Sequence, residues 1–125
     1  MITVELDNRS GSGIDDVAVV ALVREALAAE GIEEGDLGIA FVAPGEMRAL
    51  KRDHLGVDEA TDVLSFPIDG RDELPDGLPR QLGDVVICPE AVSGEWRWPL
   101  VHGLLHLLGY EHGAEMRLRE EALTS

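Results

Sequence analysis

HGLLHLLGYEH, residues 102–112, is the stretch that says most about this chain. An α-helix makes one turn in about 3.6 residues. His102 and His106 are four residues apart, so they project from the same face of a predicted helix. Gly109 ends that helix, since glycine takes the left-handed conformation without steric cost, and the chain then folds back and brings His112 towards the other two. Three imidazoles with a fourth position left open are the ligands of a catalytic zinc ion. The sequence therefore predicts one zinc per chain, held by these three histidines.

The same spacing occurs in zinc proteases that carry the pattern H-E-x-x-H-x-x-G-x-x-H. In those enzymes the glutamate after the first histidine is the general base. Gly103 stands at that position here and has no side chain to accept a proton. A purely structural role for the histidines is the alternative, but three of the four histidines of the chain fall in this window. The pattern thus predicts the ligands of a zinc hydrolase without the base of a peptidase.

Composition indicates one globular domain over residues 1–125, since 45% of the residues are hydrophobic and the length suffices for a core. The apolar stretches are too short to span a membrane, and the N-terminal sequence does not resemble a secretory signal. With Cys88 as the one cysteine, these features lead us to expect a cytoplasmic protein.

The net charge of −15 repels phosphate backbones. A role with nucleic acid therefore requires a local basic patch or a partner protein that supplies affinity. Adaptation of the surface for solubility or for a saline host is the alternative explanation of this charge.

Hydrophobic patterns predict the order β-α-β-α-β-β-α-α. The expected strands are 2–6, 37–42, 63–68 and 85–88, and the expected helices are 15–30, one starting at 44, the histidine helix and 113–123. Residues 69–81 are expected to form a surface loop or a β-ribbon, and 90–99 a short leading segment. This order predicts an α+β (α/β) domain with a small mixed sheet of about four strands packed by helices, and a zinc site on a C-terminal helix and the turn after it.

Two further motifs precede the histidines, TDVLSFP at 61–67 and GDVVICPE at 83–90. Together the three blocks resemble the YbeY family of metal-dependent endoribonucleases, also called ribosomal RNA maturation factors. The resemblance covers roughly residues 37 to 125. It implies a small mixed sheet with surrounding helices, one zinc on the three histidines, cleavage of single-stranded RNA, and a part in rRNA processing and ribosome quality control with protein partners on the ribosome. It also implies that the two strands line a groove beside the metal.

Some positions depart from the pattern of that family. His54, Leu55 and Ala60 stand where the resemblance implies an aromatic residue, an arginine and a proline. Leucine cannot contact phosphate, so either Arg52 or Arg48 takes over that role or catalysis is weaker. The segment 90–101 is also shorter than the family pattern implies.

Candidate catalytic residues beyond the metal-activated water, which is expected to attack a phosphodiester, are Arg52, Asp62 and Glu111. Glu111, where the family has aspartate, is adjacent to a ligand, but a supporting role next to that ligand or at a helix start is the stronger interpretation. Asp62 either bonds to a ligand or, as we favour, pins a turn. For Ser65 and Cys88 we expect structural roles. The hydroxyl of Ser65 is expected to form a hydrogen bond with a backbone group, and Cys88 is expected to be a small buried side chain.

Arg48, Lys51 and Arg52 form the densest basic cluster and are predicted to contact phosphate, the alternative being a solvated helix face. Trp96 and Trp98 either stack on unpaired bases or fill the edge of the core. The functional hypothesis is a zinc-dependent endoribonuclease. The alternatives are a non-catalytic ribosome-assembly factor with a structural zinc, and a zinc hydrolase of another substrate.

Overall fold

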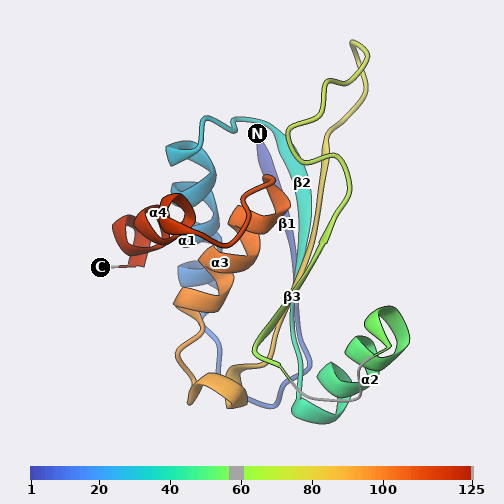
Figure 1. The fold of residues 1–125 in the computed structure, drawn as a ribbon, viewed down its shortest axis with the longest axis vertical. Helices are drawn as coiled ribbons and strands as arrows, with labels where there is room; N and C mark the ends of the chain where they lie inside the picture. The colour runs from blue at the N-terminus through green and yellow to red at the C-terminus, as the bar shows by residue number, and fades with distance from the viewer. Residues whose placement is uncertain (57–60, 125) are drawn as a thin grey trace.

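Four strands form one mixed sheet in the order β1–β2–β4–β3 (Figure 1). The computed structural model describes residues 1–56 and 61–124, so the position of Ala60 lies outside the described residues. β1 runs parallel to β2 and β2 runs parallel to β4, whereas β3 is antiparallel to β4. The strands are Ile2–Asn8 (β1), Gly35–Phe41 (β2), Val63–Pro67 (β3) and Gln81–Ile87 (β4). The predicted four-stranded mixed sheet is confirmed.

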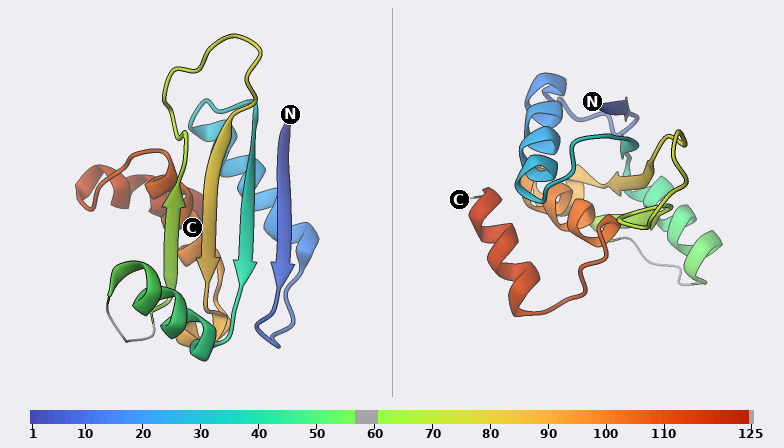
Figure 2. Two further views of the ribbon diagram at one scale, coloured as in Figure 1. Left: turned by 90° about the vertical axis from the view of Figure 1, so that its right-hand side faces the viewer. Right: turned by 90° about the horizontal axis from the view of Figure 1, so that it is seen from above.

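Helices lie on both sides of this sheet: α1, α3 and α4 on one face and α2 on the other (Figures 1 and 2). Asp15 begins α1 by accepting a hydrogen bond from the backbone N–H of Ala18 at 3.2 Å. Pro44 opens α2, where its missing N–H costs nothing. Within the described residues, no helix is both long and apolar enough to pass through a bilayer. The helices are Asp16–Ala29 (α1), Pro44–Leu55 (α2), Arg97–Leu107 (α3) and Ala114–Thr124 (α4), with a short 3₁₀ helix, Pro89–Val92 (η1).

The two largest errors in the predicted boundaries are the starts of β4 and α3. β4 begins at Gln81 and not at Val85, because pairing with β2 reaches back to Asp36 and extends the strand beyond its continuous apolar run. α3 begins at Arg97, inside the segment that was expected to lead into it. Pro99 fits there because the first turn of a helix leaves its N–H groups unpaired.

The main core fills the space between the sheet and the pair α1 and α3. Trp96 is buried in it, with its ring edge-on to Phe41 at a centroid distance of 6.2 Å. A second, smaller cluster lies beneath α2, and Cys88 is fully buried there, as predicted. The core therefore places α3 against the sheet and leaves one side of that helix for the histidines.

At Gly103, the helix α3 approaches the sheet closely. A Cβ atom at this position would lie 2.5 Å from Val85 Cγ1 and 3.1 Å from Val63 Cγ2, so a larger residue does not fit. The hydroxyl of Ser65 donates a hydrogen bond to the Gly103 carbonyl at 3.1 Å, which confirms the structural role predicted for Ser65. The sequence had suggested only that Gly103 removes a base. The structure adds that it seats α3, the helix that carries His102 and His106, on β3 and β4.

Gly103→Ala should destabilise the protein although alanine favours helix by about 1 kcal/mol over glycine. Overpacking against the stiff side chain of Val85 costs about 1–3 kcal/mol, which leaves a net loss of up to about 2 kcal/mol. Urea unfolding of the metal-free protein measures this change. Gly45→Ala is the matched control, because Gly45 lies in α2 with open space around it. A Gly103→Ala variant that gains as much stability as Gly45→Ala does would contradict the proposed packing.

Candidate metal centre

The Nε2 atoms of His102, His106 and His112 converge on one point. Nε2 of His106 lies 3.1 Å from Nε2 of His102 and 2.9 Å from Nε2 of His112. The first two side chains are half-buried and the third is exposed, so the cluster opens to solvent. Among residues 1–56 and 61–124, this is the group of histidine, cysteine and acidic side chains that could hold a metal ion.

The turn after α3 brings the third histidine to the first two. α3 ends at Leu107, and Gly109 has a φ of +94°, the left-handed region in which glycine is favoured. Its backbone N–H donates to the carbonyl of His106 at 3.1 Å, and the N–H of Tyr110 donates to the carbonyl of Leu105 at 3.1 Å. The predicted helix end and reversal at Gly109 are confirmed.

Hydrogen bonds on the other ring nitrogens fix which nitrogen faces the metal position. Nδ1 of His106 donates to the backbone carbonyl of Tyr110 at 2.9 Å, and Nδ1 of His102 donates to the carboxylate of Glu120. Because a carbonyl and a carboxylate only accept, each Nδ1 carries the proton. Both Nε2 atoms therefore present lone pairs to each other, an arrangement that a bound cation stabilises.

This donor set fits a metal ion. In tetrahedral coordination with metal–nitrogen bonds of about 2.0–2.1 Å, the nitrogens are separated by about 3.3 Å, close to the separations seen here. Burial lowers the pKa of His106, and the nearby His102 and His112 lower it further, while the bond to the Tyr110 carbonyl partly offsets this. A lowered pKa keeps the imidazole neutral, which is the form that binds a metal.

Glu120 is a site residue that the sequence analysis missed. It lies on α4, its side chain is 8% exposed, and it contacts His102 across 18 residues of chain. Met116, Glu120 and Leu123 share one face of α4, and Met116 and Leu123 pack in the cluster between α3 and α4. An acidic residue within an apolar stripe was therefore the signal available in the sequence.

The two tryptophans have different environments. Trp96 fills the core, as one of the two interpretations held. Trp98 is 41% exposed, and its ring stacks on His102 with a centroid distance of 5.0 Å and an interplanar angle of 28°. An aromatic surface thus adjoins the metal position directly.

The basic cluster lies elsewhere. α2 carries Arg48, Lys51 and Arg52 on the face of the sheet opposite α3, so the structure does not bring these residues together with the histidines (Figure 1). Arg52 Nε lies 3.4 Å from Asp53 Oδ1, on the same helix. Leu55, at the position where an arginine was implied, is 58% exposed at the end of α2.

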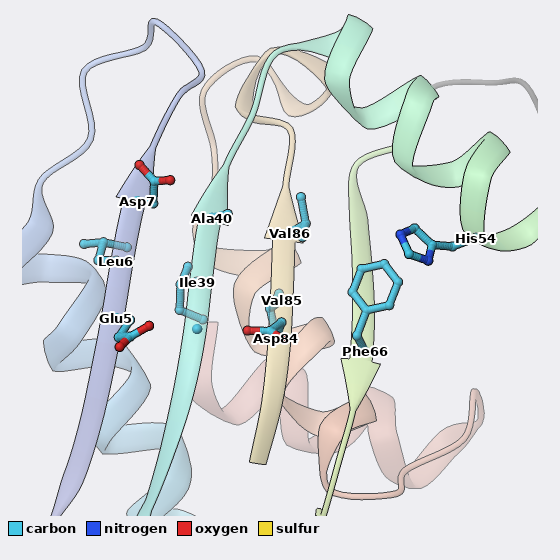
Figure 3. A pocket seen from close by; sticks show the side chains of 11 residues that line it. Glu5, Leu6, Asp7, Ile39, Ala40, His54, Phe66, Asp84, Val85 and Val86 are labelled. Carbon is cyan, nitrogen blue, oxygen red and sulfur yellow. The ribbon is translucent and has the colours of Figure 1, made fainter. Parts of the chain in front are cut away.

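Beside α2, the open face of the sheet forms a groove of about 560 Å³. The carboxylates of Glu5 and Asp84 lie on the two sides of β2, and His54 lies against Phe66 with a centroid distance of 5.2 Å (Figure 3). The acidic lining disfavours phosphate in this groove. His54 is therefore at the edge of an acidic surface and not beside the metal position.

Asp62 and Glu111 are placed apart from each other. The carbonyl of Asp62 accepts from the N–H of Cys88 at 2.8 Å, and its carboxylate lies 3.4 Å from the hydroxyl of Thr61, contacts of the kind that pin a turn. Glu111 is exposed on the turn next to His112. A catalytic role for either residue stays a prediction.

The fold and the three histidines define a small α+β protein with an open metal-binding centre. The profile of the family described as Endoribonuclease YbeY matches residues 5–123. The Endoribonuclease YbeY of Chloroflexus aurantiacus is 38% identical over 97% of this chain and 92% of its own length, and that of Salinispora tropica is 34% identical over 95% and 88%. The chain belongs to the endoribonuclease YbeY family, as its motifs had indicated.

A solved structure agrees with this fold. The solution structure of TM1509 from Thermotoga maritima has a TM-score of 0.57 to this chain and covers 98% of it and 86% of its own length. At 22% identity this similarity concerns the fold alone.

Glu120→Ala should weaken zinc binding by about 10–100-fold, because His102 loses the acceptor that orients its ring. Competition with a chromophoric chelator measures the affinity. The neighbouring Glu121→Ala is the matched control, since that side chain is exposed on the same helix. Equal affinities of the two variants would show that Glu120 does not support the ligand.

Proposed function

We propose that this protein is a zinc-dependent endoribonuclease that cleaves single-stranded RNA and takes part in rRNA maturation and ribosome quality control. The observation that carries the proposal is the convergence of the three Nε2 atoms beside an open surface. The family name of the relatives supports the activity on RNA. We further propose that residues 1–125 act as one domain in the cytoplasm, consistent with a single buried cysteine that forms no disulfide within the chain.

The assigned ligands are His102, His106 and His112, with one zinc per chain. Nitrogen donors in a set of three with an open position favour zinc in a catalytic role. Bound zinc supplies Lewis acidity at a phosphoryl oxygen and a water activated for attack near neutral pH. Glu120 and the carbonyl of Tyr110 hold two of the imidazoles so that their Nε2 atoms stay unprotonated. With Gly103 at the position of the peptidase base, phosphodiester hydrolysis is favoured over peptide hydrolysis.

The residues to test for proton transfer or charge stabilisation are Glu111, which is next to a proposed ligand, Asp62 and Arg52. Arg48, Lys51 and Arg52 would contact phosphates remote from the metal, because α2 lies on the opposite face of the sheet. In a chain of net charge −15, ribosome-associated proteins would supply the rest of the affinity for RNA.

A non-catalytic assembly factor is the second candidate function. One observation favours it: an exposed leucine, Leu55, occupies the position where the family resemblance implies an arginine. Such a protein would bind zinc and the ribosome without cleaving RNA.

His106→Ala should abolish both zinc content and RNA cleavage, because His106 is the ligand that contacts both others. Elemental analysis of protein purified without chelators and cleavage of a labelled single-stranded RNA measure the two properties. His54→Ala is the control, a histidine on α2 away from the cluster. Cleavage that survives loss of the metal would contradict the proposed mechanism, and zinc without cleavage in the wild type would favour the assembly factor.

Trp98→Ala should raise the KM for single-stranded RNA by about 5–150-fold, the loss of about 1–3 kcal/mol from one base stacked on the ring. kcat should change little if zinc content is kept. Trp98→Phe should retain most of the affinity, since a smaller aromatic surface remains. An unchanged KM in Trp98→Ala would show that the exposed ring does not bind the substrate.

A further inference from the structure

Glu30 is a buried acid remote in sequence from the histidines. It is the C-cap residue of α1, and its side chain is only 2% exposed. Burying a carboxylate away from water costs considerable free energy unless charged or hydrogen-bonding groups surround it. The identity of those groups indicates what Glu30 does.

Three other side chains meet at Glu30. The hydroxyl of Tyr110 donates to Oε1 at 2.6 Å, and Nη2 of Arg71 donates to the same oxygen at 2.9 Å. Nη1 of Arg119 lies 3.6 Å from Oε2, which accepts no hydrogen bond from the described residues. Glu30 thus joins α1, the loop between β3 and β4, the metal-binding turn and α4.

Arg71 extends this cluster to the ends of two helices. Its Nη1 donates to the backbone carbonyl of Glu30 at 3.1 Å, and its Nε donates to the carbonyl of Leu108 at 3.3 Å. These carbonyls belong to the C-cap residues of α1 and α3, which have no partner within their own helices. One guanidinium therefore closes both helices at the point where the metal-binding turn begins.

Tyr110 connects the cluster to the metal position. Its hydroxyl is held by Glu30, its N–H by the carbonyl of Leu105, and its own carbonyl accepts the Nδ1 proton of His106. Because the residue is held at both ends, a shift of the ring moves the carbonyl that orients His106. His112 follows two residues later on the same turn.

We propose that Glu30 and Arg71 are positioning residues of the metal centre, which act by fixing Tyr110 and thereby the direction of His106 and the place of His112. The inference rests on the metal site of the proposed function and concerns how that site is held in shape. For packing alone, apolar side chains would stabilise this region as well as a buried ion pair does. Charged hydrogen bonds have directional geometry as well, so they also fix one conformation of the turn. Neither residue touches the metal position.

The test compares zinc affinity and the visible absorption spectrum of the Co²⁺-substituted protein. Tyr110→Phe removes only the hydroxyl that binds Glu30, and Glu30→Gln keeps the shape but removes the charge. Both should bind zinc about 10–100-fold more weakly than the wild type and should shift the Co²⁺ absorption bands. Chelator competition gives the affinity, and neither readout depends on RNA cleavage.

Two control variants separate positioning from stability. Arg9→Lys alters an arginine that pairs with Asp7 and Glu46 and not with Glu30. Val19→Ala opens a cavity in the core beneath α1 and lowers the free energy of unfolding. Both should keep the zinc affinity and the Co²⁺ spectrum of the wild type.

The outcomes are distinct. If Tyr110→Phe and Glu30→Gln lose stability as Val19→Ala does but keep the wild-type affinity and spectrum, the cluster is only a structural clamp and the inference is overturned. A wild-type protein that binds neither Zn²⁺ nor Co²⁺ would overturn the proposed function, and this inference with it. Weaker zinc binding and a shifted spectrum in the two variants alone would support the positioning role.

Discussion

The contact of α3 with β3 and β4 at Gly103 determines how the helix that carries His102 and His106 lies on the sheet. Successive residues of a helix point about 100° apart, so a residue pressed against the sheet turns its neighbour His102 to the side. His106 follows one turn later on that same side. With a side chain at position 103 the helix would stand further from Val85, and the ring of His102 would be displaced from Glu120. The sheet thus sets the direction of His102 and His106, although none of the three histidines lies on a strand.

Charge is distributed unevenly between the surface and the interior of this acidic protein. Most of its 25 acidic residues face solvent, whereas Glu30 and Glu120 are buried. Each of the two meets a specific donor, Tyr110 and Arg71 in one case and His102 in the other. Both buried acids therefore belong to the surroundings of the three histidines, and the exposed ones account for the charge that keeps RNA away from the remaining surface.

The parts of the site that depend on nearby residues could be predicted from the sequence. The i, i+4 spacing of His102 and His106 and the turn at Gly109 follow from helix geometry and glycine stereochemistry, and the order of strands and helices follows from hydrophobic patterns. Glu30 and Arg71 could not be found in this way, because their partners lie dozens of residues away and no local pattern marks them. The position of α2 on the face opposite the histidines also depends on how the sheet is assembled, which local periodicity does not report.

The three proposed ligands come from only eleven consecutive residues, and this has a consequence for the linkage between metal binding and folding. A flexible segment with histidines so close in sequence retains some affinity for zinc when the chain is unfolded. A metal ion that binds both the folded and the unfolded chain stabilises the folded chain only by the difference between its two binding affinities. Glu120 reaches His102 only after α4 has docked, and Glu30 reaches Tyr110 only after α1 has docked, so both contacts exist in the folded state alone. On the proposed assignment, the coupling of zinc binding to folding therefore depends on two glutamates that are not ligands as well as on the histidines.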